Sequence, residues 1–93
     1  MDSVLQKQLD EMSEIELKEV IRKEFQRRLI RYTMTKDYFE KKYNMDFDYF
    51  EKLNIVKKQN YSFEVESDVQ KWEVALDGII TVKRKLKELL SAN

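Results

Sequence analysis

The sequence predicts an all-α fold: a small helical domain with a long N-terminal helix, two short helices and a long C-terminal helix with a heptad pattern. The chain of 93 residues contains no proline and one glycine, so few residues break a helix. Its apolar residues recur at spacings of three and four, which is typical of helices with one buried face. A domain this small buries a modest share of its surface, so we expect residues 1–93 to form one domain that dimerises.

The first long helix is predicted to begin at Ser13. Ser13 and Glu16 form a capping-box pattern, in which each side chain can satisfy a free backbone N–H at a helix start. The helix should then run to about Met34, because apolar residues follow at helical spacing: Leu17, Ile21, Phe25, Leu29 and Tyr32. Leu5, Leu9 and Met12 indicate an earlier helix or an extension of the same one, and residues 1–12 form either a flexible or a separate segment.

Two short helices are predicted in the middle of the chain. Thr35 can cap the first, residues 36–43, and Asn44 can end it in the left-handed conformation. Asp46 can cap the second, residues 47–53.

The chain between the second short helix and the last long helix is predicted to lack helix. Residues 54–60 are expected to form a loop. Residues 61–66, "YSFEVE", alternate between apolar and polar as a strand does, but they have no obvious pairing partner. We therefore expect extended chain packed on the helices.

The last helix is predicted to begin at Ser67 or Asp68. A heptad seam follows, with one lysine in it: Val69, Trp72, Leu76, Ile79, Lys83, Leu86 and Leu90. Further apolar residues broaden this face: Ala75, Ile80, Val82 and Leu89. A face this broad favours a place in a core or in the dimer interface.

The composition excludes many functions. The chain has no cysteine, so disulfides and thiolate metal sites are impossible, and no histidine, the commonest general base and metal ligand. We expect no enzymatic activity and no cofactor. The 18 basic and 18 acidic side chains cancel, so no net charge favours nucleic acid. No apolar run approaches the roughly 20 residues of a membrane span, and a cytoplasmic protein is expected.

The acidic residues between Tyr61 and Ile79 are candidates for a catalytic or metal site. Glu73 and Asp77 lie one helical turn apart and, with Glu66 or Asp68, could hold magnesium through their oxygens. Exposed, solvated carboxylates are the simpler explanation. Glu16-x-x-Glu19 matches half of the acidic signature of all-α nucleotide pyrophosphohydrolases, but the Glu-x-x-Asp half is missing, because Leu76 stands three residues after Glu73.

A basic segment supplies an alternative function. Residues 22–42 contain eight basic and three acidic side chains, whereas residues 46–77 contain four basic and eight acidic ones. The alternative is a small nucleic-acid-binding protein that uses Arg22, Arg27, Arg28 and Arg31 to bind phosphates. A helix-turn-helix centred on "KYNMDF" is disfavoured, because its second helix would carry Asp48 and Glu51 toward phosphates.

Two motifs carry a family resemblance that covers residues 28–86. The first is "KYNMDF", and the second combines Glu64, Glu66, Asp68, Trp72 and Glu73. In that order they resemble small proteins of archaea and cyanobacteria that are often encoded beside a toxin gene and are regarded as its antitoxin. Asn44 stands where that family has glycine, and Asn is the next-best residue for a left-handed position. The resemblance implies a helical, non-catalytic protein that binds and silences a toxin, for which a ribonuclease is expected.

The resemblance also implies a partner-binding surface. Tyr61, Phe63 and Trp72 would be its aromatic anchors, and Glu64, Glu66 and Glu73 would face a basic RNA-binding cleft. The competing interpretation of Trp72 is a core residue, because it lies on the heptad seam.

Overall fold

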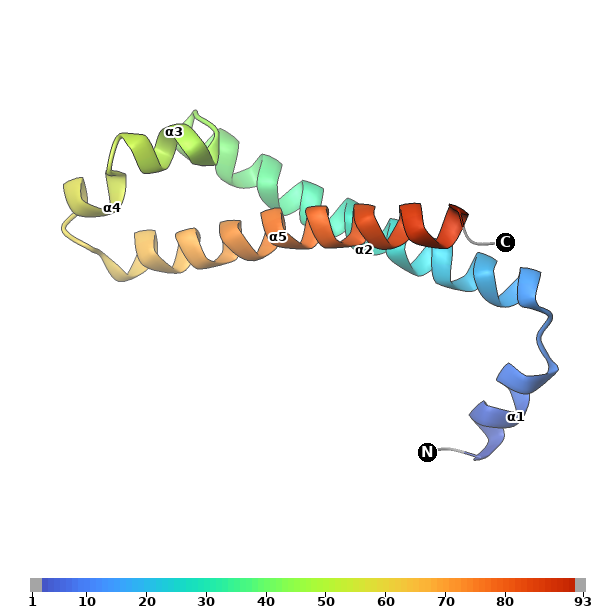
Figure 1. Cartoon of the computed structure of the whole chain (residues 1–93). Coiled ribbons are helices and arrows are strands. Elements are labelled where there is room, and N and C mark those ends of the chain that lie inside the picture. The colour runs from blue at the N-terminus through green and yellow to red at the C-terminus, as the bar shows by residue number, and fades with distance from the viewer. Residues whose placement is uncertain (1–2, 92–93) are drawn as a thin grey trace.

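The computed structural model describes residues 3–91, and every regular element in that range is a helix. The elements are α1 (Ser3–Glu11), α2 (Glu14–Tyr43), α3 (Phe47–Lys52), α4 (Ile55–Lys58) and α5 (Phe63–Ser91). The two long helices, α2 and α5, run in opposite directions and pack against each other, and α3 and α4 connect them at one end (Figure 1). The all-α prediction is confirmed.

Helix α2 is longer than predicted. Its start is as expected, since the Ser13 hydroxyl accepts a hydrogen bond from the backbone N–H of Glu16 at 3.1 Å. The predicted break at Thr35 is wrong. The Thr35 hydroxyl donates to the carbonyl of Arg31 at 3.1 Å, and no proline or glycine interrupts the turn, so the helix continues. It ends where Asn44 adopts the left-handed conformation, with φ of 56°, as predicted.

Two short helices do lie in the middle, but their positions differ from the prediction. Helix α3 begins as expected, because the Asp46 carboxylate accepts a hydrogen bond from the backbone N–H of Tyr49 at 2.8 Å. The predicted loop at residues 54–60 instead contains α4, a single helical turn that Asn54 opens in a left-handed conformation.

The predicted extended segment at residues 61–66 is also wrong from Phe63 onward, where α5 begins. The Ser62 hydroxyl accepts a hydrogen bond from the backbone N–H of Val65 at 3.3 Å, so Ser62 takes the capping role that was expected of Ser67 or Asp68. The alternation in "YSFEVE" therefore reflects a helix start with one buried side chain, Val65, among exposed ones.

The core lies at the α3 end of the hairpin and is built around Trp72. The indole is fully buried, and its ring centre lies 5.0–5.8 Å from four other aromatic rings: Phe39, Tyr43, Phe47 and Phe50. Val65 completes the cluster. The structure thus assigns Trp72 to the core.

The buried face of α5 is a heptad seam, but it is rotated from the predicted one. Its residues are Val65, Asp68, Trp72, Ala75, Ile79, Val82, Leu86 and Leu89. The predicted seam members Lys83 and Leu90 are exposed. This seam packs against α2 of the same chain, so of the two predicted places, a core or a dimer interface, the face takes the first.

The molecule is elongated and thin. Its radius of gyration is 18.5 Å, against about 12 Å for a compact chain of this length. Its shortest dimension is 16 Å, little more than the roughly 10–12 Å diameter of one helix. The long helices therefore form a single layer whose outer faces are open. Helix α1 is a separate helix that stands away from this layer (Figure 1), and residues 1–2 of the predicted N-terminal segment lie outside the described range.

Candidate functional site

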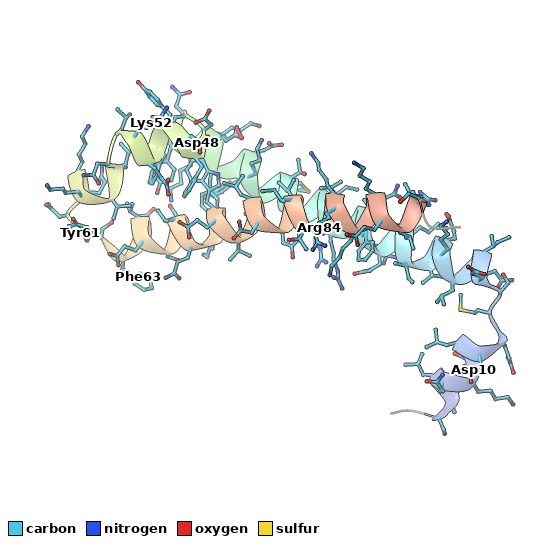
Figure 2. All side chains as sticks on the ribbon, viewed as in Figure 1. Asp10, Asp48, Lys52, Tyr61, Phe63 and Arg84 are labelled. Atoms are coloured by element: carbon cyan, nitrogen blue, oxygen red, sulfur yellow. The ribbon has the colours of Figure 1, made fainter. Side chains whose placement is uncertain are left out.

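The six residues predicted to bind a partner have three different environments. Trp72 is in the core and is not available to a partner. Glu64 takes part in a polar network that joins the two long helices. Glu64 is exposed but paired, whereas four residues are exposed and, in the described part of the chain, have no side-chain partner across the helices: Tyr61, Phe63, Glu66 and Glu73. Tyr61 and Phe63 lie together at the tip of the hairpin, where α5 begins (Figure 2).

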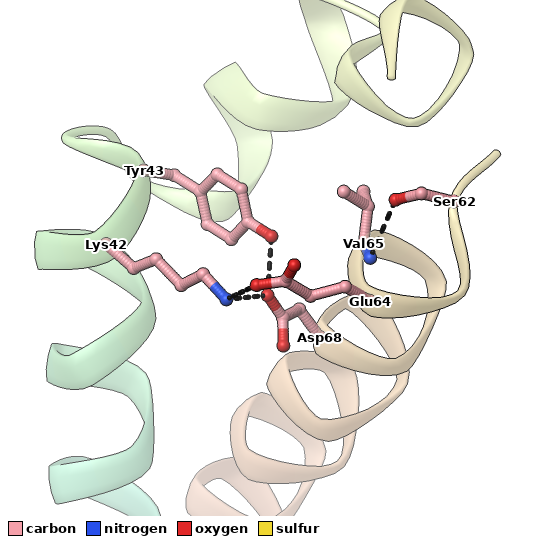
Figure 3. A network of polar contacts seen from close by, with 6 residues as sticks. All are labelled: Lys42, Tyr43, Ser62, Glu64, Val65 and Asp68. Carbon is pink, nitrogen blue, oxygen red and sulfur yellow. Dashed lines mark hydrogen bonds and ion pairs between the residues drawn. The ribbon is translucent and has the colours of Figure 1, made fainter. Parts of the chain in front are cut away.

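The polar network joins the end of α2 to the start of α5. The ammonium group of Lys42 donates to the Asp68 carboxylate at 2.6 Å and to Glu64 at 2.8 Å, and the Tyr43 hydroxyl donates to Asp68 at 2.5 Å. Figure 3 shows all four side chains pointing toward one another across the gap between the helices. Asp68 is 7% exposed, so its charge is compensated by donors from α2.

The pKa values of this network follow from its geometry. Burial alone would raise the pKa of Asp68, but the hydrogen bonds from Lys42 and Tyr43 outweigh it, and the pKa is lowered. Burial and the hydrogen bond to Asp68 raise the pKa of Tyr43 to about 12. The hydrogen bonds to Asp68 and Glu64 raise the pKa of Lys42. The network therefore stabilises the contact between α2 and α5 and keeps Asp68 ionised. None of these three shifts brings a pKa toward neutral pH, where a general acid or base would need it.

A second set of carboxylates lies on the opposite, solvent-facing side of α5. Phe63, Glu66, Glu73 and Asp77 follow one another at steps of three, seven and four, which places them on one face of the helix. We call these four residues the outer strip. All are exposed, and within residues 3–91 no ion pair or side-chain hydrogen bond engages Glu66, Glu73 or Asp77. The outer strip thus presents an aromatic ring and three charges that the fold does not use.

Tyr61, next to the outer strip, has a strained backbone. Its φ is 52°, a left-handed conformation that is unfavourable for a bulky residue, and its side chain is 59% exposed. Glycine or asparagine would fit this turn better, and asparagine does occupy the other left-handed positions, Asn44, Asn54 and Asn60. The fold gains little from a tyrosine here, so the ring is a candidate for contact with another molecule.

The four arginines of the nucleic-acid alternative do not form one surface. Arg22 and Arg31 are nine residues apart, about two and a half helical turns, and therefore point to opposite sides of α2. Arg22 is held by Glu19, with Nε 2.8 Å from a carboxylate oxygen, and Arg28 is held by Glu24 at 3.1 Å. Arg27 lies 3.9 Å from Glu24. Neighbouring glutamates on α2 thus offset most of the charge of these arginines.

One surface feature was missed from the sequence. A groove of about 740 Å³ runs between α2 and α5, with Phe39 and Ala75 among its lining and the exposed side chains of Met34, Tyr38 and Val74 along its sides. A weak sequence signal for it existed: Ile30, Met34 and Tyr38 repeat every four residues, beside the stronger apolar stripe that forms the core. No sequence pattern predicts that Lys42 and Tyr43 contact Asp68, because these residues are far apart in the chain and are brought together by the packing of α2 against α5.

No group of three or more carboxylates within residues 3–91 is placed to hold a metal ion. In the same range, no helix is both long enough and apolar enough to cross a bilayer. The chain matches no family model, no curated protein and no solved structure.

Proposed function

We propose that this chain is a non-catalytic protein-binding module, an antitoxin that neutralises a toxin encoded beside it. The observation that carries the proposal is the outer strip: an 87% exposed phenylalanine followed on the same helix face by three unpaired carboxylates, with the strained Tyr61 at its end. Exposed aromatic anchors with charges around them are typical of protein interfaces.

The chemistry of the strip favours a basic partner. Glu66, Glu73 and Asp77 span about three helical turns, so a rigid helix presents the charges at fixed positions. A cleft that binds RNA carries lysine and arginine side chains that contact the phosphates. A row of carboxylates can form ion pairs with those same side chains. The resemblance of residues 28–86 to antitoxins supports a ribonuclease as the toxin. Inhibition then requires only that the strip cover the cleft.

The structure alters the surface that the sequence suggested. Trp72 contributes to the core and Glu64 to the network with Lys42, so neither is assigned to the partner. Asp77, which the resemblance did not include, joins Phe63, Glu66 and Glu73 on the same face. The proposed contact surface is therefore Tyr61 together with the outer strip.

The test is co-expression with the product of the adjacent gene. The neighbour alone should arrest growth, and co-expression should restore it and yield a complex that co-purifies. Glu66→Lys or Glu73→Lys should each weaken that complex by about tenfold or more, since each places a cation against a basic surface. The matched control is Glu11→Lys, the same charge change at the end of α1, which lies far from the hairpin tip (Figure 1).

Two outcomes would contradict the proposal at different levels. A harmless neighbour, or one that forms no complex, would remove the antitoxin function. A complex that the strip variants and Glu11→Lys weaken equally would retain the function and remove the outer strip as its site. Helix content measured by circular dichroism should be unchanged in all three variants, because the substituted side chains are exposed.

A further inference from the structure

The outward face of α2 carries an apolar ridge that the monomer leaves open. Ile30, Met34 and Tyr38 follow at steps of four and are 59%, 66% and 60% exposed. Three large apolar side chains in one row on a helix surface differ from the scattered exposed apolar residues of ordinary surfaces. The ridge borders the groove between α2 and α5, because Met34 and Tyr38 also line that groove.

The groove beside the ridge is shaped to receive side chains. Its lining includes the buried Phe39 and Ala75 together with Tyr32, and its α5 side is formed by Gln70, Lys71 and Val74. Val74 is 62% exposed, so apolar surface is present on both walls. A helix lying along the ridge would cover the α2 wall of this groove, which Met34 and Tyr38 form.

The pattern around Met34 is self-complementary. When two copies of a helix pack antiparallel with the same residue at the two-fold axis, a residue n positions before it faces the residue n positions after it in the other copy. With Met34 at the axis, Ile30 faces Tyr38, four positions on either side. Arg31 faces Asp37, three positions on either side, so each such contact pairs opposite charges.

We propose that the occupant of this ridge is a second copy of the chain, which docks α2 antiparallel against α2 with Met34 at a two-fold axis. The dimer contains two Arg31–Asp37 ion pairs and places Ile30 of each copy opposite Tyr38 of the other, at the mouth of the groove. Because Met34 lies on the side of α2 away from α5, the two hairpins join edge to edge in a four-helix assembly that covers the ridge of each copy.

Two like-charge contacts oppose the two ion pairs in this dimer. Arg27 and Lys41 lie seven positions on either side of Met34 and so face each other with like charge. Glu24 lies 3.9 Å from Arg27 within the same chain and offsets part of that repulsion. The chain carries no net charge, so no long-range repulsion opposes association of two copies.

This dimer surface is independent of the proposed function. The ridge lies on α2, whereas the outer strip lies on α5, and no residue belongs to both. A dimer can therefore form whether or not the chain is an antitoxin, and failure of one proposal does not imply failure of the other.

The first experiment uses the absence of native cysteine. In a Met34→Cys variant the two thiols meet at the axis, so mild oxidation or a short bifunctional maleimide should link most of the protein as covalent dimer. The matched control is Val20→Cys, which is also exposed on α2 but lies 14 residues, about 21 Å, from the axis. Its cross-linking should stay at background level.

The second experiment exchanges the charges and measures association by sedimentation equilibrium. Arg31→Asp and Asp37→Arg should each weaken the dimer by about tenfold or more, because each creates two like-charge contacts. The double variant restores opposite charges and should return to within about threefold of the original dissociation constant. Positions 31 and 37 are six residues apart on one helix, so they do not pair within a chain.

Three results would each overturn this dimer. The first is sedimentation of the unmodified chain as a folded monomer at about 0.1 mM. The second is cross-linking of Met34→Cys no better than that of Val20→Cys. The third is a double charge exchange that does not recover the association lost in the single variants. Circular dichroism of each variant verifies that the exposed substitutions leave the hairpin folded.

Discussion

The ring of Tyr32 on α2 lies directly against the backbone of Gly78 on α5. A Cβ atom built on Gly78 would come within 2.6–2.7 Å of three ring carbons of Tyr32, closer than side chains tolerate. Glycine in the middle of a helix costs about 0.5–1 kcal/mol relative to alanine, so the only glycine of the chain is placed where its lack of a side chain matters. The close approach of the two long helices at this point depends on it.

Gly78→Ala should therefore destabilise the protein by about 1–3 kcal/mol, despite the better helix propensity of alanine. In a Tyr32→Ala background the ring is absent, and the same change should stabilise by up to about 1 kcal/mol. Urea denaturation of the four proteins measures both effects. A loss of stability of equal size in both backgrounds would show that the Tyr32 ring is not the obstacle.

The register of the buried seam on α5 could not be predicted from the sequence because of Asp68. The apolar Val69 fits an apolar pattern better than the neighbouring Asp68, so the predicted seam begins at Val69 and reaches Lys83 two heptads later. In the structure Asp68 is buried and Lys83 is exposed. The reason lies 25 and 26 residues away, in Tyr43 and Lys42, whose hydrogen bonds make burial of the carboxylate acceptable.

Stability should decline at acidic pH in part through Asp68. The folded pKa of Asp68 is lowered, so its contribution is present above the unfolded pKa of about 3.9 and is lost as the pH falls through the lower folded value. Asp68→Asn should remove this part of the acid sensitivity and cost about 1–3 kcal/mol at neutral pH. Urea midpoints between about pH 2 and 7 give both quantities. Glu66→Gln, which changes an exposed carboxylate outside the network, is the matched control.

The same network predicts an alkaline transition. The folded pKa of Tyr43 is raised to about 12, so its contribution is complete below the unfolded value near 10 and is lost as the pH rises through 12. Spectroscopic titration of the tyrosines should show one that ionises well above the rest, and Tyr43→Phe should remove it. If all five tyrosines ionise together in the folded protein, the hydroxyl of Tyr43 does not donate to Asp68 as the structure shows.

The fluorescence of Trp72 should be that of a buried tryptophan. It is fully buried, so its fluorescence should be blue-shifted, protected from acrylamide and unchanged when a partner binds the outer strip. Trp72→Ala should cost about 3–5 kcal/mol, because it removes the ring around which four other aromatic rings pack. Strong quenching in the folded state, or a large spectral change on complex formation, would instead place Trp72 at the interface.

The candidate site was only partly accessible from the sequence. The sequence shows that aromatic and acidic residues gather between positions 61 and 77, but it does not show which side of a helix each of them occupies. Once the helix is known to begin at Phe63, steps of three and four separate Glu66 and Glu73 from the inward-facing Asp68 and Trp72. The assumed extended conformation of residues 61–66 prevented that separation.

Tyr61 offers a way to separate folding from partner binding. Its backbone is in the left-handed region at φ of 52°, so Tyr61→Gly should relieve strain and leave the stability unchanged or raise it by about 1 kcal/mol. The same change removes an exposed ring beside the outer strip, so the affinity for the partner should fall by about tenfold or more. Tyr61→Asn, which keeps a side chain suited to this conformation, should likewise stabilise and weaken binding. Thermal melting and titration of the co-purified partner test the two effects in the same samples. A glycine variant that is less stable and binds the partner normally would show that the Tyr61 ring stabilises the fold. The strained backbone at Tyr61 would then be no evidence for a contact surface.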